Sequence, residues 1–477
     1  MSLWNALEAA ANTGGALCAK GLMPEGELPE ESWVAEGLSI DTRTIQPGDI
    51  FVAIKDVRDG HDFVRSAFAA GASAALVSRA PKDTPDGKPL LLVPDTLAGL
   101  RDLAAAARDR CFGKLIGVTG SAGKTSTKEM LRAALAPSGK VHAAQKSFNN
   151  HLGVPLTLAA LPKDADFGVF EIGMNHAGEI TPLTDLVRPH IAIVTTVAAA
   201  HLEFFASVEE IAEAKAEIFS GLRGIGNNMG VAILPKDNPY FDLLANRATQ
   251  LAAAEIISFG TDAGSRIRMT SYEPQPSGLN TVHVDFDGTP LSFQLGLTGQ
   301  HQAMNALAVL GAVKAVGGSL DKAIAALEAM QPVEGRGARH QLRIDGRKVT
   351  LIDESYNANP ASMAVSISGL GAMPIQGKRI AVLGEMRELG ESEAALHLDL
   401  ANALEVAKID LVFAAGPLMK EMYETLPEAM RGGFAATALD LVAPVKDAAM
   451  AGDIIMAKGS NASRVGLFVK ELIASGT

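Results

Sequence analysis

The residues best suited to chemistry in this sequence form a short glycine-containing loop at positions 119–126. The apolar run LIGVT leads into TGSAGKTS, and the helix-compatible stretch TKEMLRAAL follows. Glycines let successive N–H groups point at phosphate oxygens, and the positive end of a helix dipole favours the same anion. Lys124 would reach the β- and γ-phosphates of a nucleotide, and the Thr125 hydroxyl would ligate Mg²⁺. The pattern predicts an ATP site that contains Gly120, Ser121, Ala122, Gly123, Lys124, Thr125 and Ser126.

The loop is a shortened form of the usual phosphate-binding pattern. Val118 stands where strict spacing puts the first glycine, so Gly120 is the only earlier glycine of the loop. The alternative is a helix entry with a chance Gly-Lys pair. The strand before the loop and the helix after it favour phosphate binding.

Three later residues could contribute to a metal site beside this loop. Glu171 closes the apolar strand FGVFE, and a carboxylate at the carboxyl end of a parallel strand would face the same crevice as the loop. His201 follows the strand IAIVTTV, and Lys215 lies in the amphipathic stretch VEEIAEAKAEIFSGL. Each has an ordinary alternative. Glu171 could be a solvated acid, His201 a surface or core residue, and Lys215 a solvated ion-pair partner.

The composition excludes several classes of protein. The chain has 477 residues, of which 48% are apolar and 20% charged, and these values are typical of a globular protein rather than a disordered one. It contains no apolar run of about 18 residues, so a membrane-spanning protein is also disfavoured. The net charge of −12 has the wrong sign for nucleic-acid binding, so any phosphate ligand must be held by a local group of residues. Only two cysteines occur and the N-terminus lacks a signal-peptide pattern, so we expect a cytoplasmic protein without membrane insertion.

The elements that must position these residues fall into three segments, as the length also suggests. Residues 1–112 mix short strand-like runs such as DIFVAI and AALVS with turns, which predicts a small α/β domain. In residues 113–332, apolar strands alternate with helical stretches, which predicts a central P-loop domain with a largely parallel sheet. Residues 333–477 repeat this alternation, which predicts a Rossmann-like open sheet. A GxGxxG fingerprint is missing there, so dinucleotide binding has no support.

Taken together, the motifs resemble one family. TGSAGKTS, NNHLGVPLTL, EIGMNHAGEI, AAAHLEFF, GQHQAMNALA, PVEGRGAR, DESYNANPASM, LGEMRELGE and AKGSNASR are similar, in this order, to motifs of the Mur ligases of peptidoglycan synthesis. The resemblance extends to SIDTRTIQPGDIFVAIKDVRDGHDF, which is similar to the uridine-nucleotide-binding domain of the family. It therefore covers nearly the whole chain.

The resemblance assigns roles to single residues. It implies that Lys215 is carbamylated, so that a cation becomes a carboxylate-like ligand. This group would bind a second Mg²⁺ ion together with Glu171 and His201. Thr125 and Glu171 would lie near the ATP-bound ion. Lys124, Lys215 and His201 would be the catalytic residues. Four positions match residues that contact the nucleotide in the family. Arg336 would approach the phosphates, and Asn305, Tyr356 and Asn357 would lie around the adenine and ribose.

The resemblance also implies substrate contacts. The uridine diphosphate would bind at Ser39, Thr42, Arg43, Lys55 and His61, of which Arg43 and Lys55 are suited to phosphate. Ordinary surface cations remain the alternative for these two. Asn149 and Asn150 would contact the muramoyl peptide or serve as a turn. Lys458 and Ser460 would bind the incoming dipeptide.

The motifs SYNANP and FEIGMNHAGEI imply one reaction within the family. This is the ATP-dependent joining of D-alanyl-D-alanine to UDP-N-acetylmuramoyl-tripeptide through an acyl phosphate, by a monomer that uses two Mg²⁺ ions. The third residue of the tripeptide, diaminopimelate or lysine, stays open. Rival hypotheses are another amino-acid-adding Mur ligase, a folylpolyglutamate synthase and a non-catalytic nucleotide switch, although no NKxD guanine motif is present.

Two departures from the family pattern bear on the site. Asp353 and Glu354 stand where many members have two aspartates, so the contact made by Glu354 is open. Asn461 stands after Ser460 in KGSNASR, which lacks a second arginine that some relatives carry.

Overall fold

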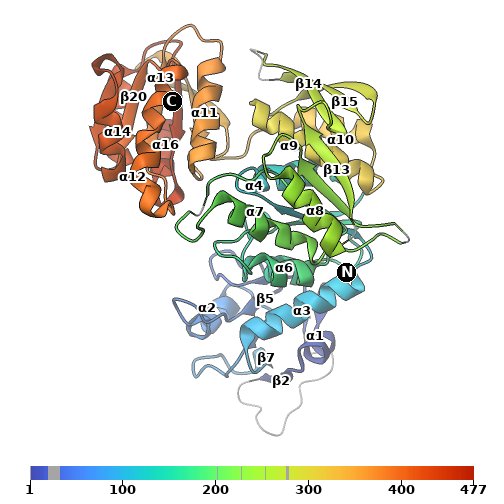
Figure 1. Cartoon of the computed structure of the whole chain (residues 1–477). Helices are drawn as coiled ribbons and strands as arrows, with labels where there is room; N and C mark the ends of the chain where they lie inside the picture. The colour runs from blue at the N-terminus through green and yellow to red at the C-terminus, as the bar shows by residue number, and fades with distance from the viewer. Residues whose placement is uncertain are drawn as a thin grey trace.

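The computed structural model describes residues 2–19, 33–200, 202–226, 228–252, 254–275 and 279–476. Its strands form three large sheets that follow one another along the chain, with helices packed on them (Figure 1). The three-domain α/β architecture predicted from the sequence is thus confirmed. The limits at residues 112 and 332 remain our proposal, and they fall between α3 and β8 and between α10 and β17.

The N-terminal part holds a five-stranded sheet in the order β2-β7-β6-β5-β4, in which only β2 is antiparallel to its neighbour. A two-stranded ribbon, β1 with β3, lies outside this sheet. The elements are β1 (Trp4–Asn5), α1 (Ala6–Thr13), β2 (Ala16–Ala19), β3 (Val34–Ala35), β4 (Gly37–Ser39), β5 (Asp49–Val52), α2 (Val64–Ala69), β6 (Ala74–Val77), β7 (Pro89–Leu92) and α3 (Thr96–Arg110).

The central part is built on a nine-stranded sheet in the order β16-β15-β14-β13-β12-β11-β8-β10-β9. The strands from β9 to β14 are parallel, and β14, β15 and β16 form an antiparallel extension that the sequence pattern did not indicate. The elements are β8 (Lys114–Thr119), α4 (Lys124–Leu135), β9 (Val141–Ala143), α5 (Gly153–Ala159), β10 (Phe167–Glu171), α6 (Ile180–Val187), β11 (Ile191–Val194), α7 (Val208–Ala216), β12 (Val231–Pro235), α8 (Phe241–Ala252), β13 (Glu255–Gly260), β14 (Ile267–Glu273), β15 (Asn280–Phe286), β16 (Thr289–Leu295), α9 (Gln300–Ala315) and α10 (Leu320–Ala329).

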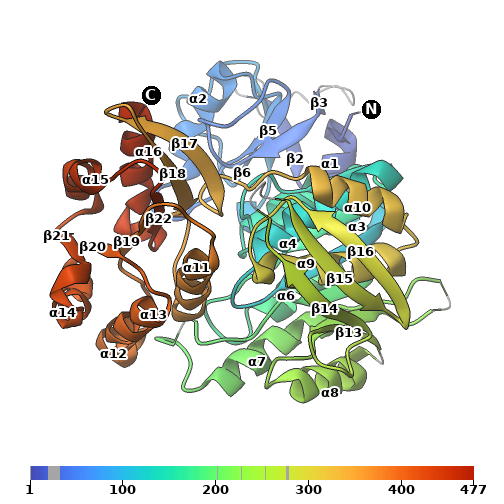
Figure 2. The same ribbon diagram turned by 90° about the horizontal axis from the view of Figure 1, so that it is seen from above.

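The C-terminal part is a six-stranded sheet in the order β17-β18-β22-β19-β20-β21, in which only β17 is antiparallel. In Figures 1 and 2, α11 lies on the side of this sheet that faces the central part. The elements are β17 (Ala338–Ile344), β18 (Arg347–Glu354), α11 (Pro360–Ala372), β19 (Arg379–Gly384), α12 (Glu393–Leu398), α13 (Leu400–Val406), β20 (Leu411–Ala415), α14 (Lys420–Thr425), β21 (Arg431–Ala435), α15 (Val442–Ala448), β22 (Ile454–Lys458) and α16 (Val465–Ser475).

The middle strands of the central sheet explain where a site can form. β8 lies between β10 and β11, parallel to both, with Glu171 paired with Val118 and Val194 paired with Thr119. The carboxyl ends of the three strands therefore meet at one edge of the sheet, where side chains from separate parts of the sequence come together. Apolar residues fill both faces of this sheet, which holds the strands in place. In the part of the chain that the structure describes, we find no helix with the length and apolarity to cross a membrane.

Trp4 joins the N-terminal part to the central part. Its ring is fully buried, its indole Nε1 donates a hydrogen bond of 2.9 Å to the Ala159 carbonyl at the end of α5, and the Arg110 guanidinium stacks 3.7 Å from the ring centre. The indole hydrogen bond therefore links segments that lie 155 residues apart in the sequence.

Replacing Trp4 with Phe should lower the free energy of unfolding by about 1–3 kcal/mol, because the buried Ala159 carbonyl loses its donor. The chain has two tryptophans, so the fluorescence of Trp33 in urea follows the unfolding of the N-terminal part of the variant. Leu7→Ala, at an exposed position on α1, is the control and should change this free energy by less than about 0.5 kcal/mol. Equal midpoints for Trp4→Phe and the parent would contradict the role of the indole.

Candidate functional site

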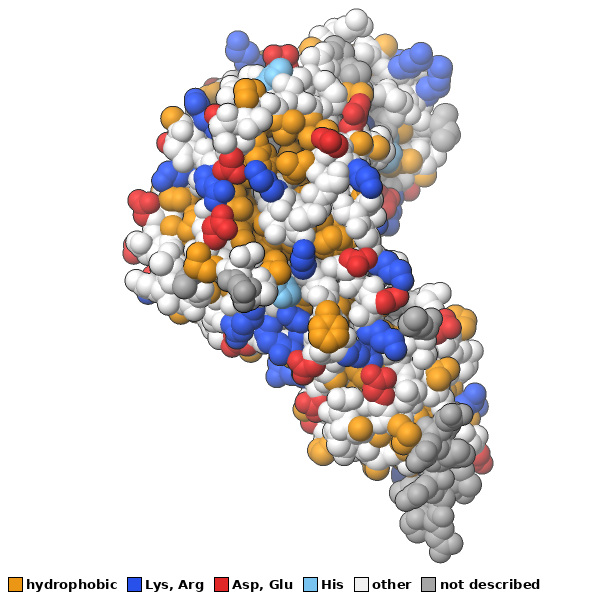
Figure 3. Space-filling model, turned by 90° about the vertical axis from the view of Figure 1, so that its right-hand side faces the viewer, with side chains coloured by type: hydrophobic (Ala, Val, Ile, Leu, Met, Phe, Trp, Pro, Cys, Tyr) orange, Lys and Arg blue, Asp and Glu red, His pale blue; other side chains and the backbone are white. Residues whose placement is uncertain are grey.

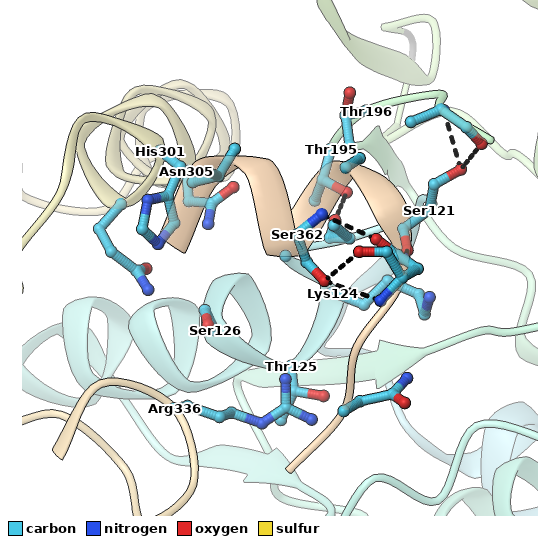
Figure 4. A pocket seen from close by; sticks show the side chains of 18 of the residues that line it. Ser121, Lys124, Thr125, Ser126, Thr195, Thr196, His301, Asn305, Arg336 and Ser362 are labelled. Carbon is cyan, nitrogen blue, oxygen red and sulfur yellow. Dashed lines mark hydrogen bonds between the residues drawn. The ribbon is translucent and has the colours of Figure 1, made fainter. Parts of the chain in front are cut away.

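The predicted glycine loop lies between the end of β8 and the start of α4. Gly120 and Gly123 have φ angles of 148° and 81°, which L side chains rarely adopt. A Cβ atom on Gly120 would lie 1.9 Å from Thr195 Oγ1, the hydroxyl that donates to the Ala122 carbonyl at 2.5 Å. The residue after β11 therefore fixes the shape of the loop (Figure 4).

Lys124, the first residue of α4, folds back over the loop. Its Nζ donates a hydrogen bond of 2.6 Å to the Gly120 carbonyl. Burial lowers the pKa of Lys124, while the nearby Glu171 carboxylate partly opposes this shift. A partly buried ammonium bonded to a backbone carbonyl can exchange this acceptor for the oxygens of a polyphosphate that also contacts the loop amides.

Glu171 is the centre of a cluster of polar side chains. The side chain is 3% exposed, and its carboxylate accepts hydrogen bonds from Thr125 Oγ1 at 2.8 Å, Ser147 Oγ at 2.6 Å and Asn149 Nδ2 at 2.8 Å. A carboxylate and two hydroxyls supply the oxygen ligands that Mg²⁺ prefers, with water and phosphate oxygens completing its shell. The residues present therefore fit a Mg²⁺ ion.

Ser147 belongs to this cluster, although sequence reasoning did not single it out. It stands two residues before Asn149 in QKSFNN, within a segment that follows β9 and contains no helix or strand. The available signal was a hydroxyl residue just ahead of the Asn pair. Among the described residues, no group of three or more His, Cys, Asp or Glu side chains could hold a metal ion.

Lys215 is buried, and its interpretation as a solvated ion-pair partner is wrong. The side chain lies on the inner face of α7 and is only 2% exposed. Burial, reinforced by the positive charge of Lys124, lowers the pKa of Lys215 well below its ordinary value. Within the described ranges, we find neither a hydrogen-bond acceptor nor a carboxylate partner for its Nζ. His201, the other predicted ligand, lies outside the described residues.

The C-terminal part contributes a second set of charged groups. The Arg336 guanidinium stacks 3.9 Å from the centre of the Tyr356 ring. Lys458 Nζ donates a hydrogen bond of 3.0 Å to the Asn357 carbonyl and lies 3.7 Å from Glu354 Oε2. Burial raises the pKa of Glu354, and the Lys458 ammonium opposes that shift. Glu354 is therefore an ion-pair partner of Lys458.

The two sets face each other across a cavity of about 660 Å³. Asn359 spans the junction, because it caps α11 through a capping box while its Nδ2 donates a hydrogen bond of 3.2 Å to the Ser121 carbonyl. Asn305 and His301 of α9 line the same cavity, and burial lowers the pKa of His301 to about 4, so this imidazole is neutral at pH 7. The lining includes Ser121, Ala122, Gly123, Lys124, Thr125, Ser126, Ser147, Asn149, Glu171, Asn305, Arg336, Tyr356, Asn357 and Lys458.

Family models and curated relatives match most of this chain. The models of the Mur ligase family match residues 35–108 (catalytic domain), 118–313 (middle domain) and 338–461 (glutamate ligase domain). UDP-N-acetylmuramoyl-tripeptide–D-alanyl-D-alanine ligase of Bacillus subtilis (strain 168) is 34% identical over 449 residues, which are 93% of this chain and 94% of the relative. The chain belongs to the Mur ligase family. The family predicted from the motifs is thereby confirmed.

Solved structures of Mur ligases superpose on nearly the whole chain. MurF from Acinetobacter baumannii has a TM-score of 0.83 and 28% identity, with 99% of each chain covered. MurF ligase from Thermotoga maritima in complex with ADP has a TM-score of 0.77 and 26% identity, with 92% of this chain and 97% of that chain covered.

The remaining predicted residues of this Mur ligase lie outside the cavity. Arg43 is exposed and paired with Asp41 at 2.6 Å, and His61 is 2% exposed between the Asp59 carboxylate and the Ser78 amide. The positions Ser39, Thr42, Arg43, Lys55 and His61 all belong to the N-terminal part. Lys and Arg side chains gather where the N-terminal part meets the rest of the molecule (Figure 3), which provides a local basic surface on an acidic chain.

Two predicted substrate contacts have local structural roles. Asn150 Oδ1 accepts hydrogen bonds from the Leu152 and Gly153 amides and so supports the start of α5. Ser460 Oγ accepts from the Ser463 amide at the turn after β22. In this Mur ligase, Asn149 and Lys458 line the cavity, whereas Asn150 and Ser460 do not.

Replacing Gly120 with Ala should weaken ATP binding by about tenfold, equivalent to about 1.4 kcal/mol, because the added Cβ displaces Thr195 and distorts the loop. Isothermal titration calorimetry with ATP measures this change. Gly288→Ala is the matched control, because Gly288 also has a positive φ of 82° but open space around its Cβ position. If Gly120→Ala leaves the ATP affinity unchanged, the role of this close contact is contradicted. The same holds if Gly288→Ala lowers the affinity as much as Gly120→Ala does.

Proposed function

We propose that this Mur ligase joins D-alanyl-D-alanine to UDP-N-acetylmuramoyl-tripeptide with ATP, giving ADP, phosphate and UDP-N-acetylmuramoyl-pentapeptide for peptidoglycan synthesis. One observation carries the proposal. Lys124, Thr125 and Glu171 converge on one side of a cavity whose other side carries Arg336 and Lys458. The names of the relatives and the ADP in the Thermotoga maritima structure support it.

In the first step a carboxylate oxygen of the tripeptide attacks the γ-phosphorus of ATP, the bond to the β-phosphate oxygen breaks, and ADP leaves. Lys124 exchanges its hydrogen bond to the Gly120 carbonyl for phosphate oxygens, and the amides at the start of α4 stabilise the same charge. Arg336, stacked on Tyr356 at the opposite wall, adds a cation. These groups stabilise the transferring phosphoryl group without forming a covalent bond to it.

In the second step the amine of D-alanyl-D-alanine attacks the activated carbonyl carbon, loses a proton, and phosphate leaves as the amide bond forms. Lys458 is the candidate to bind the dipeptide carboxylate, because it is a buried cation that lines the cavity. Glu354 and the Asn357 carbonyl hold the Lys458 ammonium in place. Closure of the two parts around the cavity would exclude water from the acyl phosphate.

The candidates to hold the Mg²⁺ ion of the nucleotide are Thr125, Ser147 and Glu171. The candidates to hold a second ion are Glu171, His201 and a carbamylated Lys215. Bound Mg²⁺ would neutralise charge on the γ-phosphate. The neutral amine that burial favours at Lys215 is the form that adds CO₂, giving a carbamate and a released proton. A cytoplasmic location and a monomeric state remain predictions.

The reaction is tested with ATP, Mg²⁺ and UDP-N-acetylmuramoyl-tripeptide carrying diaminopimelate or lysine, together with D-alanyl-D-alanine or single amino acids. We expect ADP release and the pentapeptide mass only with the dipeptide. Lys124→Met should lower the rate about 100-fold or more, because one stabilising cation is lost. Phosphate release only with a single amino acid or a folate would refute the assignment, and release that no acceptor stimulates would favour a nucleotide switch.

Replacing Lys215 with Ala should lower the ligation rate by about 100-fold, because the carbamate that supports the second ion is lost. Short carboxylic acids should partly restore the rate by supplying an anion in the vacated space. Glu209→Ala, at an exposed position of the same helix, is the control and should keep the parent rate. Full activity of Lys215→Ala would remove this lysine from the site. Native mass spectrometry at neutral pH should show a larger CO₂ adduct for the parent than for Lys215→Ala.

A further inference from the structure

Lys128 is a fully buried charge that the mechanism above does not use. It lies one turn after Lys124 on α4 and is 0% exposed. Its Nζ contacts three acceptors, the Ala144 carbonyl at 2.6 Å, the Lys146 carbonyl at 3.2 Å and Glu129 Oε1 at 2.8 Å. An ammonium has three N–H donors, so each donor of Lys128 is matched by one acceptor.

Two of these acceptors belong to the backbone of the segment 144–150, which contains no helix or strand. The same segment carries Ser147 and Asn149, which both donate hydrogen bonds to the Glu171 carboxylate. Lys128 therefore ties α4, which begins at the glycine loop, to the backbone that presents the polar groups around Glu171. The Gly173 amide, which donates to the Asn149 carbonyl, anchors the far side of the segment.

The chemistry of Lys128 indicates a role beyond packing. A buried ion pair is often no more stabilising than apolar side chains of similar volume, so packing alone does not require a lysine here. An apolar side chain could fill the space but could not bond to the carbonyls of residues 144 and 146. Glu129 also pairs with Arg132 at 2.8 Å, so its charge has a second partner.

We propose that Lys128 is a positioning residue that fixes the segment 144–150, so that Ser147 and Asn149 remain at Glu171 and the nucleotide site keeps its affinity for Mg²⁺. The inference rests on the proposed Mg²⁺ site. It assigns to Lys128 no contact with substrate, and its effect passes through the backbone of the segment.

The test replaces Lys128 with Met and measures ADP binding by calorimetry with and without Mg²⁺. We expect the Mg²⁺ concentration for half-maximal tightening of ADP to rise about tenfold, the low end of the range for residues behind metal ligands. ADP affinity without Mg²⁺ should stay within about twofold of the parent, because the glycine loop is intact. The half-saturating Mg²⁺ concentration of phosphate release should shift in parallel.

Glu129→Gln is the matched control. It removes the charge of the ion pair but leaves the lysine bonded to both carbonyls, so the Mg²⁺ requirement should equal that of the parent even if the melting temperature falls. If Lys128→Met does not fold, the double variant Lys128→Met/Glu129→Gln, which leaves no lone carboxylate beside the methionine, receives the same measurement.

The outcomes separate the two hypotheses. A parent protein whose ADP binding is insensitive to Mg²⁺ refutes the proposed metal site and the inference with it. A Mg²⁺-sensitive parent with an unchanged requirement in Lys128→Met refutes the positioning role alone. Equal shifts in Lys128→Met and Glu129→Gln would also refute it, because the ion pair rather than the carbonyl bonds would then carry the effect.

Discussion

A buried carboxylate is the constraint on which the rest of the site depends. Glu171 ends the strand β10 in an environment where an unpaired charge would be severely destabilising. Its oxygens are satisfied by donors from the start of α4 and from the segment after β9, so the two must approach each other. The glycine loop and the carboxylate can share this edge because β8 and β10 are adjacent parallel strands. The topology thus brings Thr125 to Glu171, which lies 46 positions later in the sequence.

The site is divided between two parts of the chain, and each half is stabilised separately. On the central side the hydroxyl of Thr195 holds the loop, and on the C-terminal side the Gly335 amide and the Ser355 hydroxyl donate to the Asp353 carboxylate. The direct link through Asn359 is a single hydrogen bond to the Ser121 carbonyl. The two walls of the cavity thus come from separate parts of the chain, and Asn359 links them at the start of α11.

The sequence predicted the features that depend on local order. The glycine loop and Glu171 were found because a loop and a strand end are visible in neighbouring residues, and the alternation of strands and helices indicated three α/β domains. Ser147 was missed because its partner lies 24 residues away, and the burial of Lys215 was missed because glutamates surround it in sequence although it faces inward. The strands β14 to β16 were missed because they continue the sheet of the central part, so no change of domain marks their antiparallel pairing.

The resting position of Lys124 has a consequence for selectivity among anions. Because its ammonium already bonds to the Gly120 carbonyl, an incoming ligand competes with an acceptor that belongs to the protein itself. A small ion such as inorganic phosphate exchanges one contact for another and gains little. A nucleoside triphosphate would also contact the loop amides and the opposite wall, so its net gain would be larger. Under the proposed reaction, the loop would thereby discriminate by the number of simultaneous contacts and would favour the triphosphate over the product phosphate.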